Sequence, residues 1–270
     1  MLRQRFISGM LLGTVLVGVV ILASPLQFAI VFALLFAIGA WEWARLTSIE
    51  NPLFRGGYLA TFFGVIAVLW WQRDSGFASI WLLLAGLFWF SIFRVLHHYH
   101  QSQNHNPRWQ FKLSVAGLLL LPSAWLAFVE LQALNPGWAL YIMVLCGVAD
   151  SFAFLFGKLF GKHKLAPQLS PGKTIEGALG GMGAVLFLAI LAGVYWQEFT
   201  LQQLLAFIAL SLVAGVISIQ GDLFESLIKR EAGQKDSGRI LPGHGGILDR
   251  FDSHIAASPL FVLGLQRILG

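Results

Sequence analysis

The run LQQLLAFIALSLVAGVISI, residues 201–219, is apolar almost throughout and close to the length of a membrane-crossing helix. About 20 apolar residues span the hydrocarbon core of a bilayer in that conformation. Comparable runs recur along the chain, in which 57% of the 270 residues are apolar and only 11% are charged. With a mean hydropathy of +0.74, the chain is predicted to be an all-α, polytopic integral membrane bundle rather than a soluble domain.

Nine runs approach the required length, and we expect about eight or nine transmembrane helices. The first run follows Arg3 and Arg5, as the apolar part of a secretory signal does. No small-residue cleavage site leads from it into a polar segment, so we expect it to be retained as a span. The predicted spans are residues 6–23, 26–40, 58–71, 77–93, 113–134, 138–156, 178–196, 201–219 and 255–269.

No repeat, low-complexity linker or soluble domain interrupts these runs, which indicates a single transmembrane domain over residues 1–270. Residues 1–134 contain few polar segments and are expected to form a scaffold. Residues 135–270 carry the polar loops, and we expect the chemistry there.

Lysine and arginine predict the orientation of the bundle. With a cytoplasmic N-terminus and alternating spans, only Arg73 and Arg267 of the 18 basic residues fall outside. Inside loops are rich in basic residues in such proteins. This bias explains the net charge of +5 without nucleic acid. It predicts that the two richest polar loops, residues 157–177 and 220–254, share the cytoplasmic face of the membrane.

Two smaller features of the sequence favour ordinary interpretations. His97, His98, His100 and His105 could together bind a metal, but neither a cysteine nor a carboxylate cluster joins them. We expect a solvated loop or a contact with lipid headgroups. Cys146 is the single cysteine, lies within a span and is expected to be a small buried residue.

The segment 218–253, SIQGDLFESLIKREAGQKDSGRILPGHGGILDRFDS, concentrates charge in a chain that has little of it. Charge this dense at a membrane surface favours a polar ligand. Asp222 and Glu225 share one side of the predicted helix end, and Glu225 can pair with Lys229 at the i,i+4 spacing. Asp222 lies nearer the bilayer, where a bound cation would offset its cost. The glycine-rich run 243–246 lets backbone amides approach phosphate oxygens closely.

A second polar segment, residues 150–181, reads DSFAFLFGKLFGKHKLAPQLSPGKTIEGALGG. Asp150 lies within an apolar stretch, and an intramembrane acid is a functional candidate. Ser170 or Thr174 is a candidate N-cap for the next helix, whose N-terminus suits an anion. Lys173 could add a positive charge to the same site.

Residues 172–174, Gly-Lys-Thr, look like the end of a phosphate-binding P-loop. The first glycine of that motif would stand at position 167, which is proline, and no soluble strand precedes it. The P-loop interpretation therefore fails. Gly177 and Gly181 instead predict a face for close helix packing.

The segment 226–252, SLIKREAGQKDSGRILPGHGGILDRFD, resembles the signature of the phosphatidate cytidylyltransferases, also called CDP-diglyceride synthetases. The N-terminal spans resemble this family only in hydropathy and length. Phe152 stands where the family usually has glycine, beside Asp150. The signature positions are Ser226, Lys229, Arg230, Lys235, Asp236, Gly238, Pro242, His244, Gly245, Gly246, Asp249, Arg250 and Asp252. Upstream, the similar positions are Asp150, Gly157, Gly161, Lys162, Ser170, Pro171, Lys173, Thr174, Glu176 and Gly177.

The resemblance implies the transfer of CMP from CTP to phosphatidic acid, giving CDP-diacylglycerol and pyrophosphate. It also implies Mg²⁺, with a second cation such as K⁺, held by carboxylates together with the triphosphate. The expected partners are CTP, phosphatidic acid and membrane lipid, with no nucleic acid. A homodimer is left open.

The resemblance also assigns roles to residues. It implies Asp222 and Asp249 as first-choice metal ligands, with Asp150 third. The implied catalytic residues are Asp222, Asp249, Lys235, Asp236, His244 and Arg250. The implied substrate-binding residues are Ser170, Lys173, Thr174, Lys229, Arg230, Gly245 and Gly246.

Three other functions compete with this interpretation. A transporter of an anionic solute would show inverted halves with matching interruptions, whereas the intramembrane acids lie almost entirely in the second half. A CDP-alcohol phosphotransferase would carry a spaced aspartate motif that opens with Asp-Gly, which is missing. A purely structural membrane protein would not need Asp150, Asp222 and Asp249 near the bilayer.

Overall fold

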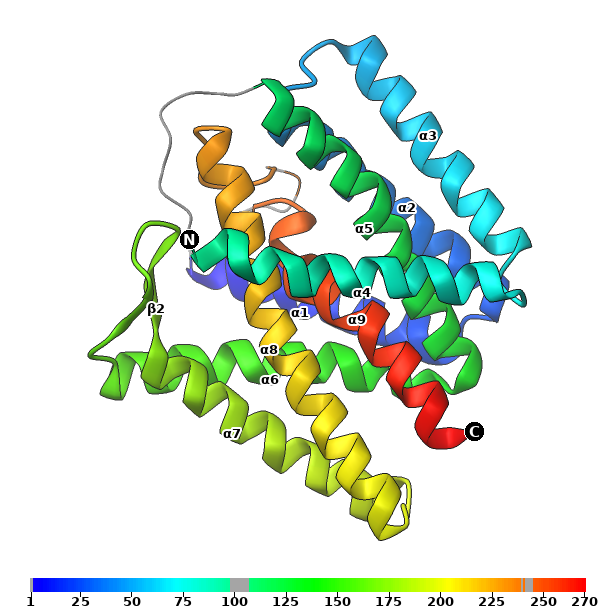
Figure 1. Cartoon of the computed structure of the whole chain (residues 1–270), viewed down its shortest axis with the longest axis vertical. Helices are drawn as coiled ribbons and strands as arrows, with labels where there is room; N and C mark the ends of the chain where they lie inside the picture. Colours follow the sequence, from blue (N-terminus) through cyan, green and yellow to red (C-terminus); the bar gives the residue numbers. More distant parts are fainter. Residues whose placement is uncertain (1, 98–106, 239, 241–244) are drawn as a thin grey trace.

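The computed structural model describes residues 2–97, 107–238, 240 and 245–270, which form a helical bundle with one small hairpin (Figure 1). The predicted all-α membrane class is confirmed. The helices are α1 (Leu2–Leu22), α2 (Pro25–Leu46), α3 (Pro52–Trp71), α4 (Gly76–His97), α5 (Pro107–Leu134), α6 (Pro136–Phe160), α7 (Ile175–Leu191), α8 (Leu201–Glu231) and α9 (Leu248–Leu269), and a π-helical turn, Ala192–Trp196, extends α7.

Seven of the described helices, α2 to α8, are long and apolar enough to cross a membrane, so the chain is a multi-pass membrane protein. Within the described part of α1, Gly13–Leu22 is a shorter apolar segment. Helix α9 is more polar, because its first turns carry Asp249, Arg250 and Asp252. The predicted span at residues 255–269 is therefore the later part of a longer, amphipathic helix.

Helix α8 extends further than the hydropathy predicts. The predicted span ends at residue 219, and the sequence predicts a polar segment over 220–254 in which Asp222 and Glu225 lie on the end of the helix. The structure continues α8 to Glu231 and begins α9 at Leu248, so helix covers more of this segment than predicted. Hydropathy marks the end of a run where charges appear, whereas a helix continues when its charged side chains have partners, as Glu225 and Lys229 do here.

The second predicted loop, residues 157–177, contains a β-hairpin that an all-α prediction does not include. Strand β1 (Lys164–Ala166) pairs antiparallel with β2 (Ser170–Thr174). Its base is fixed by Glu176, whose carboxylate accepts hydrogen bonds from the backbone amides of Lys162 and His163 and contacts the His163 ring at 2.6 Å. The hairpin therefore projects from the junction of α6 and α7.

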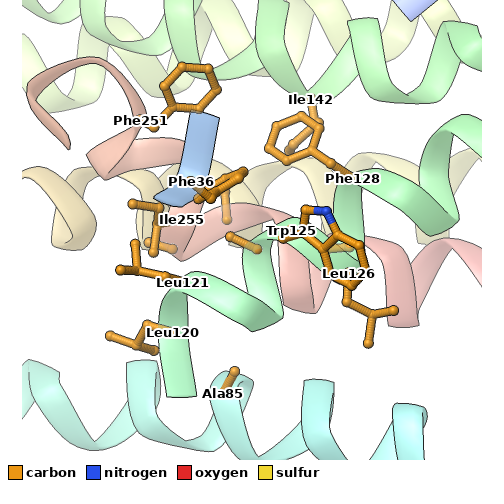
Figure 2. Packing of buried hydrophobic residues seen from close by; sticks show 14 of the residues in the cluster. Phe36, Ala85, Leu120, Leu121, Trp125, Leu126, Phe128, Ile142, Phe251 and Ile255 are labelled. Atoms are coloured by element: carbon orange, nitrogen blue, oxygen red, sulfur yellow. The ribbon is translucent and has the colours of Figure 1, made fainter. Parts of the chain in front are cut away.

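Aromatic side chains fill the contact between α2, α5 and α9 (Figure 2). The ring of Phe251 lies 5.7 Å from that of Phe36 and 6.5 Å from that of Phe128. Trp125 is buried in the same region and donates its indole N–H to the Ala29 carbonyl at 2.9 Å. Because this indole has an acceptor, it can be buried without leaving a polar group unsatisfied.

Hydrogen bonds between helix ends show which loops lie at the same end of the bundle. At one end, Arg45 in the last turn of α2 donates to the Ser237 carbonyl after α8 at 2.7 Å. At the other, Gln203 near the start of α8 donates to the Ile268 carbonyl near the end of α9 at 3.2 Å. The segments that follow α2 and α8 thus share an end, as the alternation predicts, and the side of the membrane stays a prediction.

Helices α6 and α7 pack at very short range, as the glycine pair predicts. A Cβ added at Gly177 would lie 2.5 Å from the Ala153 carbonyl oxygen, and one at Gly181 would lie 2.6 Å from that of Ala149. Small residues allow helix backbones to approach in this way inside a membrane. The contact holds α6 and α7, which flank the hairpin in the chain, close together.

We expect Gly181→Ala to destabilise the protein by about 1–3 kcal/mol, because backbone atoms cannot move aside as a flexible side chain can. Gly183→Ala is the matched control, since a Cβ there meets nothing within 4 Å and alanine favours helix. The measurement is the melting temperature in detergent, monitored through the loss of the monodisperse chromatographic peak on heating. Equal or higher melting of the Gly181 variant would contradict the tight contact.

Candidate active site

A polar cavity of about 570 Å³ lies where the β-hairpin meets the C-terminal parts of α6 and α8 and the first turns of α7 and α9. Its lining mixes carboxylates with cations, which is unusual in a chain this apolar. The acidic residues are Asp150, Asp222, Asp249 and Asp252, the basic ones are Lys158, Lys173 and Arg250, and Ser170, Thr174, Gly157 and Gly172 contribute further polar surface.

Three of these carboxylates come from three different helices. Asp150 of α6, Asp222 of α8 and Asp252 of α9 all line the cavity, and Asp150 is exposed there. The pKa of Asp252 is raised to about 8, first by burial and then by the negative charges of Asp222 and Asp150. A carboxylate whose pKa is raised by neighbouring negative charges marks a place where added positive charge is stabilising.

Lys173 supplies positive charge next to these acids. Its ammonium lies 2.6 Å from the carboxylate of Asp222, and both side chains are about a quarter exposed. The end of β2 places it there, because the next residue, Thr174, begins α7 by accepting a hydrogen bond from the Gly177 amide at 3.1 Å. The predicted N-cap is therefore Thr174, while Ser170 begins β2 and lines the cavity.

Asp249 has a different environment from the other three acids. Its Oδ2 accepts hydrogen bonds from the Ser237 amide at 2.9 Å, the Ser237 hydroxyl at 2.8 Å and the Gly246 amide at 2.8 Å. Its Oδ1 accepts from the Lys229 ammonium at 2.7 Å. Burial raises the pKa of Asp249, but these donors lower it further, to below its ordinary value. Asp249 is thus an ionised anchor for the segment between α8 and α9.

Lys229 bridges two buried carboxylates. It contacts Asp249 at 2.7 Å and Glu225 at 2.6 Å, and its side chain is only 14% exposed. The predicted i,i+4 pair of Glu225 and Lys229 is therefore present. A lysine held in this way is already neutralised, so its predicted role in binding substrate is not visible in these contacts.

The structure brings together one part of the predicted site and leaves another part outside the cavity. Arg230, Lys235 and Asp236 are exposed on the surface, and His244 lies outside the described residues. Gly245 adopts a positive φ of 82°, and Gly246 donates to Asp249, so both shape the turn rather than the cavity wall. The predicted residues that line the cavity are Asp150, Ser170, Lys173, Thr174, Asp222, Asp249 and Arg250.

The other sequence expectations have mixed outcomes. Cys146 is fully buried, as expected. Phe152 and Phe156 line a separate apolar groove between α6 and α7. Phe152 therefore does not line the polar cavity beside Asp150. In the histidine cluster, residues 98–106 lie outside the described residues.

Sequence reasoning missed three polar residues at this end of the bundle. Asp252 belongs to the signature but received no role, and Lys158 was counted only for orientation; both line the cavity. Glu42, on α2, is 3% exposed and accepts hydrogen bonds from the described segment after α8. The signal was available, because Glu42 is the sole acid in residues 25–46, a stretch whose other charged residue is Arg45.

The donor set can be tested against a metal ion. Among the described residues, no three His, Cys, Asp or Glu side chains converge closely enough to hold a metal by protein ligands alone. Magnesium is commonly bound by one or two carboxylates together with substrate phosphates. The oxygens of Asp150 and Asp222 in one cavity fit this second arrangement.

A multi-pass bundle with acids and cations gathered in a cavity at one end defines a membrane enzyme that handles phosphate groups. The chain belongs to the cytidylyltransferase family, which it matches over residues 3–267. It is 40% identical over 265 residues to a phosphatidate cytidylyltransferase of Pseudomonas aeruginosa, covering 97% of this chain and 96% of the relative. A phosphatidate cytidylyltransferase of Haemophilus influenzae is 34% identical over 282 residues, with 97% of each chain covered.

A Staphylococcus aureus protein of the same name is 45% identical over 142 residues, which is 53% of this chain and 52% of the relative. The predicted family resemblance is therefore confirmed. The transporter alternative has no support from these matches.

We expect Lys229→Met to destabilise the protein by about 3–5 kcal/mol, because it leaves the carboxylates of Glu225 and Asp249 buried without their shared cation. Arg230→Gln, at the neighbouring exposed position, is the control and should melt like the parent protein. Adding Glu225→Gln to Lys229→Met should recover part of the loss. Thermal melting in detergent measures all three, and a Lys229→Met protein as stable as the control would contradict this account.

Proposed function

We propose that this chain transfers CMP from CTP to phosphatidic acid, giving CDP-diacylglycerol and pyrophosphate. The observation that carries the proposal is the cavity in which Asp150, Asp222 and Asp252 face Lys173 at one end of an apolar bundle. The curated relatives named phosphatidate cytidylyltransferase support the choice of substrates.

The chemistry joins two polyanions. A phosphate oxygen of phosphatidic acid attacks the α-phosphorus of CTP, a new P–O bond forms, and the bond to the β-phosphate breaks as pyrophosphate leaves. No protein nucleophile is needed, so the protein contributes positioning and neutralisation of charge. Lys158, Lys173 and Arg250 are the cavity residues that can neutralise phosphate oxygens.

Asp150 and Asp222 would hold magnesium, with Asp252 next to them and the substrate phosphates completing the ligands. When bound, this ion would neutralise the charge on the phosphate oxygens. Asp249, which the resemblance implies as a ligand, already accepts hydrogen bonds at both oxygens, so we propose that it acts mainly by holding the α8–α9 segment beside the cavity.

The location of the cavity suggests how the two substrates arrive. Its polar lining lies at one end of the bundle, while the outer faces of α6 and α7 carry exposed apolar side chains such as Leu159, Phe187 and Leu179. Phosphatidic acid can keep its acyl chains among lipids while its headgroup enters the cavity. We propose that CTP enters from the cytoplasmic side of a bacterial inner membrane, in agreement with the bias of basic residues.

Purified protein is expected to release pyrophosphate from CTP only when phosphatidic acid and Mg²⁺ are both present. Asp222→Asn should reduce turnover at least about a hundredfold, because it removes one of the two carboxylates proposed to hold the cation that neutralises the reacting phosphates. Asp74→Asn, an exposed acid on the loop after α3, is the control. CDP-diacylglycerol is measured by thin-layer chromatography of labelled product. Turnover without phosphatidic acid, or full activity of the Asp222 variant, would refute the proposal.

Lys173→Gln should raise the KM for CTP about tenfold or more, since it removes a cation that can contact the triphosphate. Lys164→Gln is the matched control, because Lys164 lies on the same hairpin, is exposed and does not line the cavity. Initial rates over a series of CTP concentrations provide the KM. Equal KM values for the two variants would show that the position of Lys173 in the cavity is unimportant for CTP.

A further inference from the structure

Glu42 of α2 reaches across the bundle to the two described flanks of the α8–α9 connection. Its carboxylate accepts hydrogen bonds from the Ser237 hydroxyl at 3.2 Å, the Ile247 amide at 3.2 Å and the Leu248 amide at 3.0 Å. The residue is 3% exposed. A single carboxylate from the N-terminal half therefore holds both flanks of the signature segment.

Helix α9 depends on this carboxylate for its N-terminal hydrogen bonds. The residue at its N-cap position, Ile247, offers no side-chain acceptor and has helical backbone angles. The first amides of a helix have no partner within the helix itself. Glu42 satisfies two of them from a separate helix, at the end where a negative charge is favoured. The direction in which α9 begins is thus set by α2.

Two glycines of the signature segment pack closely against the same carboxylate. A Cβ added at Gly238 or at Gly246 would collide with the carboxylate oxygens of Glu42. Both positions have ordinary φ values, so backbone freedom does not require glycine there. The space taken by Glu42 gives a physical reason for glycine at positions 238 and 246.

The Ser237 hydroxyl connects Glu42 with the cavity. It lies 3.2 Å from Oε2 of Glu42 and 2.8 Å from Oδ2 of Asp249, which lines the cavity. A hydroxyl has one proton to donate, so the two carboxylates share this group. The backbone amide of Ser237 also donates to Asp249, which keeps Asp249 in place when the hydroxyl turns to Glu42.

We infer that Glu42 is a positioning residue for the transfer reaction: through Ser237 and the first amides of α9, it fixes Asp249, Arg250 and Asp252 relative to Asp150 and Asp222. This inference rests on the proposed function, because it names a further residue that the reaction requires. Glu42 does not touch the cavity itself and acts through the α8–α9 segment. A displacement of about 1 Å at reacting groups is enough to cost on the order of a hundredfold in rate.

The test compares Glu42→Gln with Glu130→Gln. Glu130 is a partly buried acid on α5 whose neighbouring charges, Arg73 and Asp74, lie on the loop after α3, far from the signature segment in the chain. We expect kcat per folded enzyme to fall on the order of tenfold to a hundredfold in Glu42→Gln, with the KM for phosphatidic acid within about twofold of the parent value. Glu130→Gln should retain the parent kcat. Size-exclusion chromatography sets the concentration of folded enzyme.

A double-mutant cycle with Ser237→Ala separates positioning from a general loss of stability. If Glu42 acts through Ser237, the double variant loses less activity than the product of the two single losses. Multiplicative losses would overturn the inference. So would an unchanged kcat in Glu42→Gln.

Hydrogen exchange supplies a readout that does not depend on turnover. Peptides containing Ile247 and Leu248 should exchange faster in Glu42→Gln than in the parent protein or in Glu130→Gln, because these amides lose part of their acceptor. Unchanged exchange would also overturn the inference. If the parent protein made no CDP-diacylglycerol, the proposed function would fail while the exchange experiment still tested the contact.

Discussion

An apolar bundle can carry carboxylates at its polar end only if each of them finds a partner. The cost of an unpaired charge at that depth is several kcal/mol, which is a large part of the stability of a whole protein. Here Lys229 lies between Glu225 and Asp249, Lys173 pairs with Asp222, and backbone amides surround Glu42. These pairings fix how α8, α9 and the hairpin meet, and the cavity is the space between them.

The same pairings connect the two halves of the chain. A division into a scaffold, residues 1–134, and a catalytic part, residues 135–270, follows from where the polar loops lie in the sequence, and it stays a prediction. Glu42 and Arg45 on α2 nevertheless bind the segment that follows α8, and Phe36 and Phe128 pack against Phe251 on α9. In physical terms the N-terminal helices are part of what holds Asp249 in place.

Hydropathy and glycine spacing predicted most of the helices and one of their close contacts. Apolar runs predicted the helices from α2 to α8, and Gly177 and Gly181 predicted the close contact of α6 with α7. The same criterion failed at the end of α8 and at the start of α9, because it treats a charge as the end of a helix. The Glu225–Lys229 pair is local and follows from its i,i+4 spacing, but no sequence pattern shows that Glu42 supplies acceptors for α9, since that depends on a tertiary contact.

The site was predictable in its residue types more than in its geometry. The acids and the lysine of the two polar segments do meet in one cavity, but four carboxylates and three cations line it, and one of the cations already pairs with Asp222. Without ligands, such a lining is close to balanced in charge. A triphosphate and a lipid phosphate would add several negative charges to it, which the remaining cations cannot neutralise. This charge count supports the divalent cation proposed for the cavity.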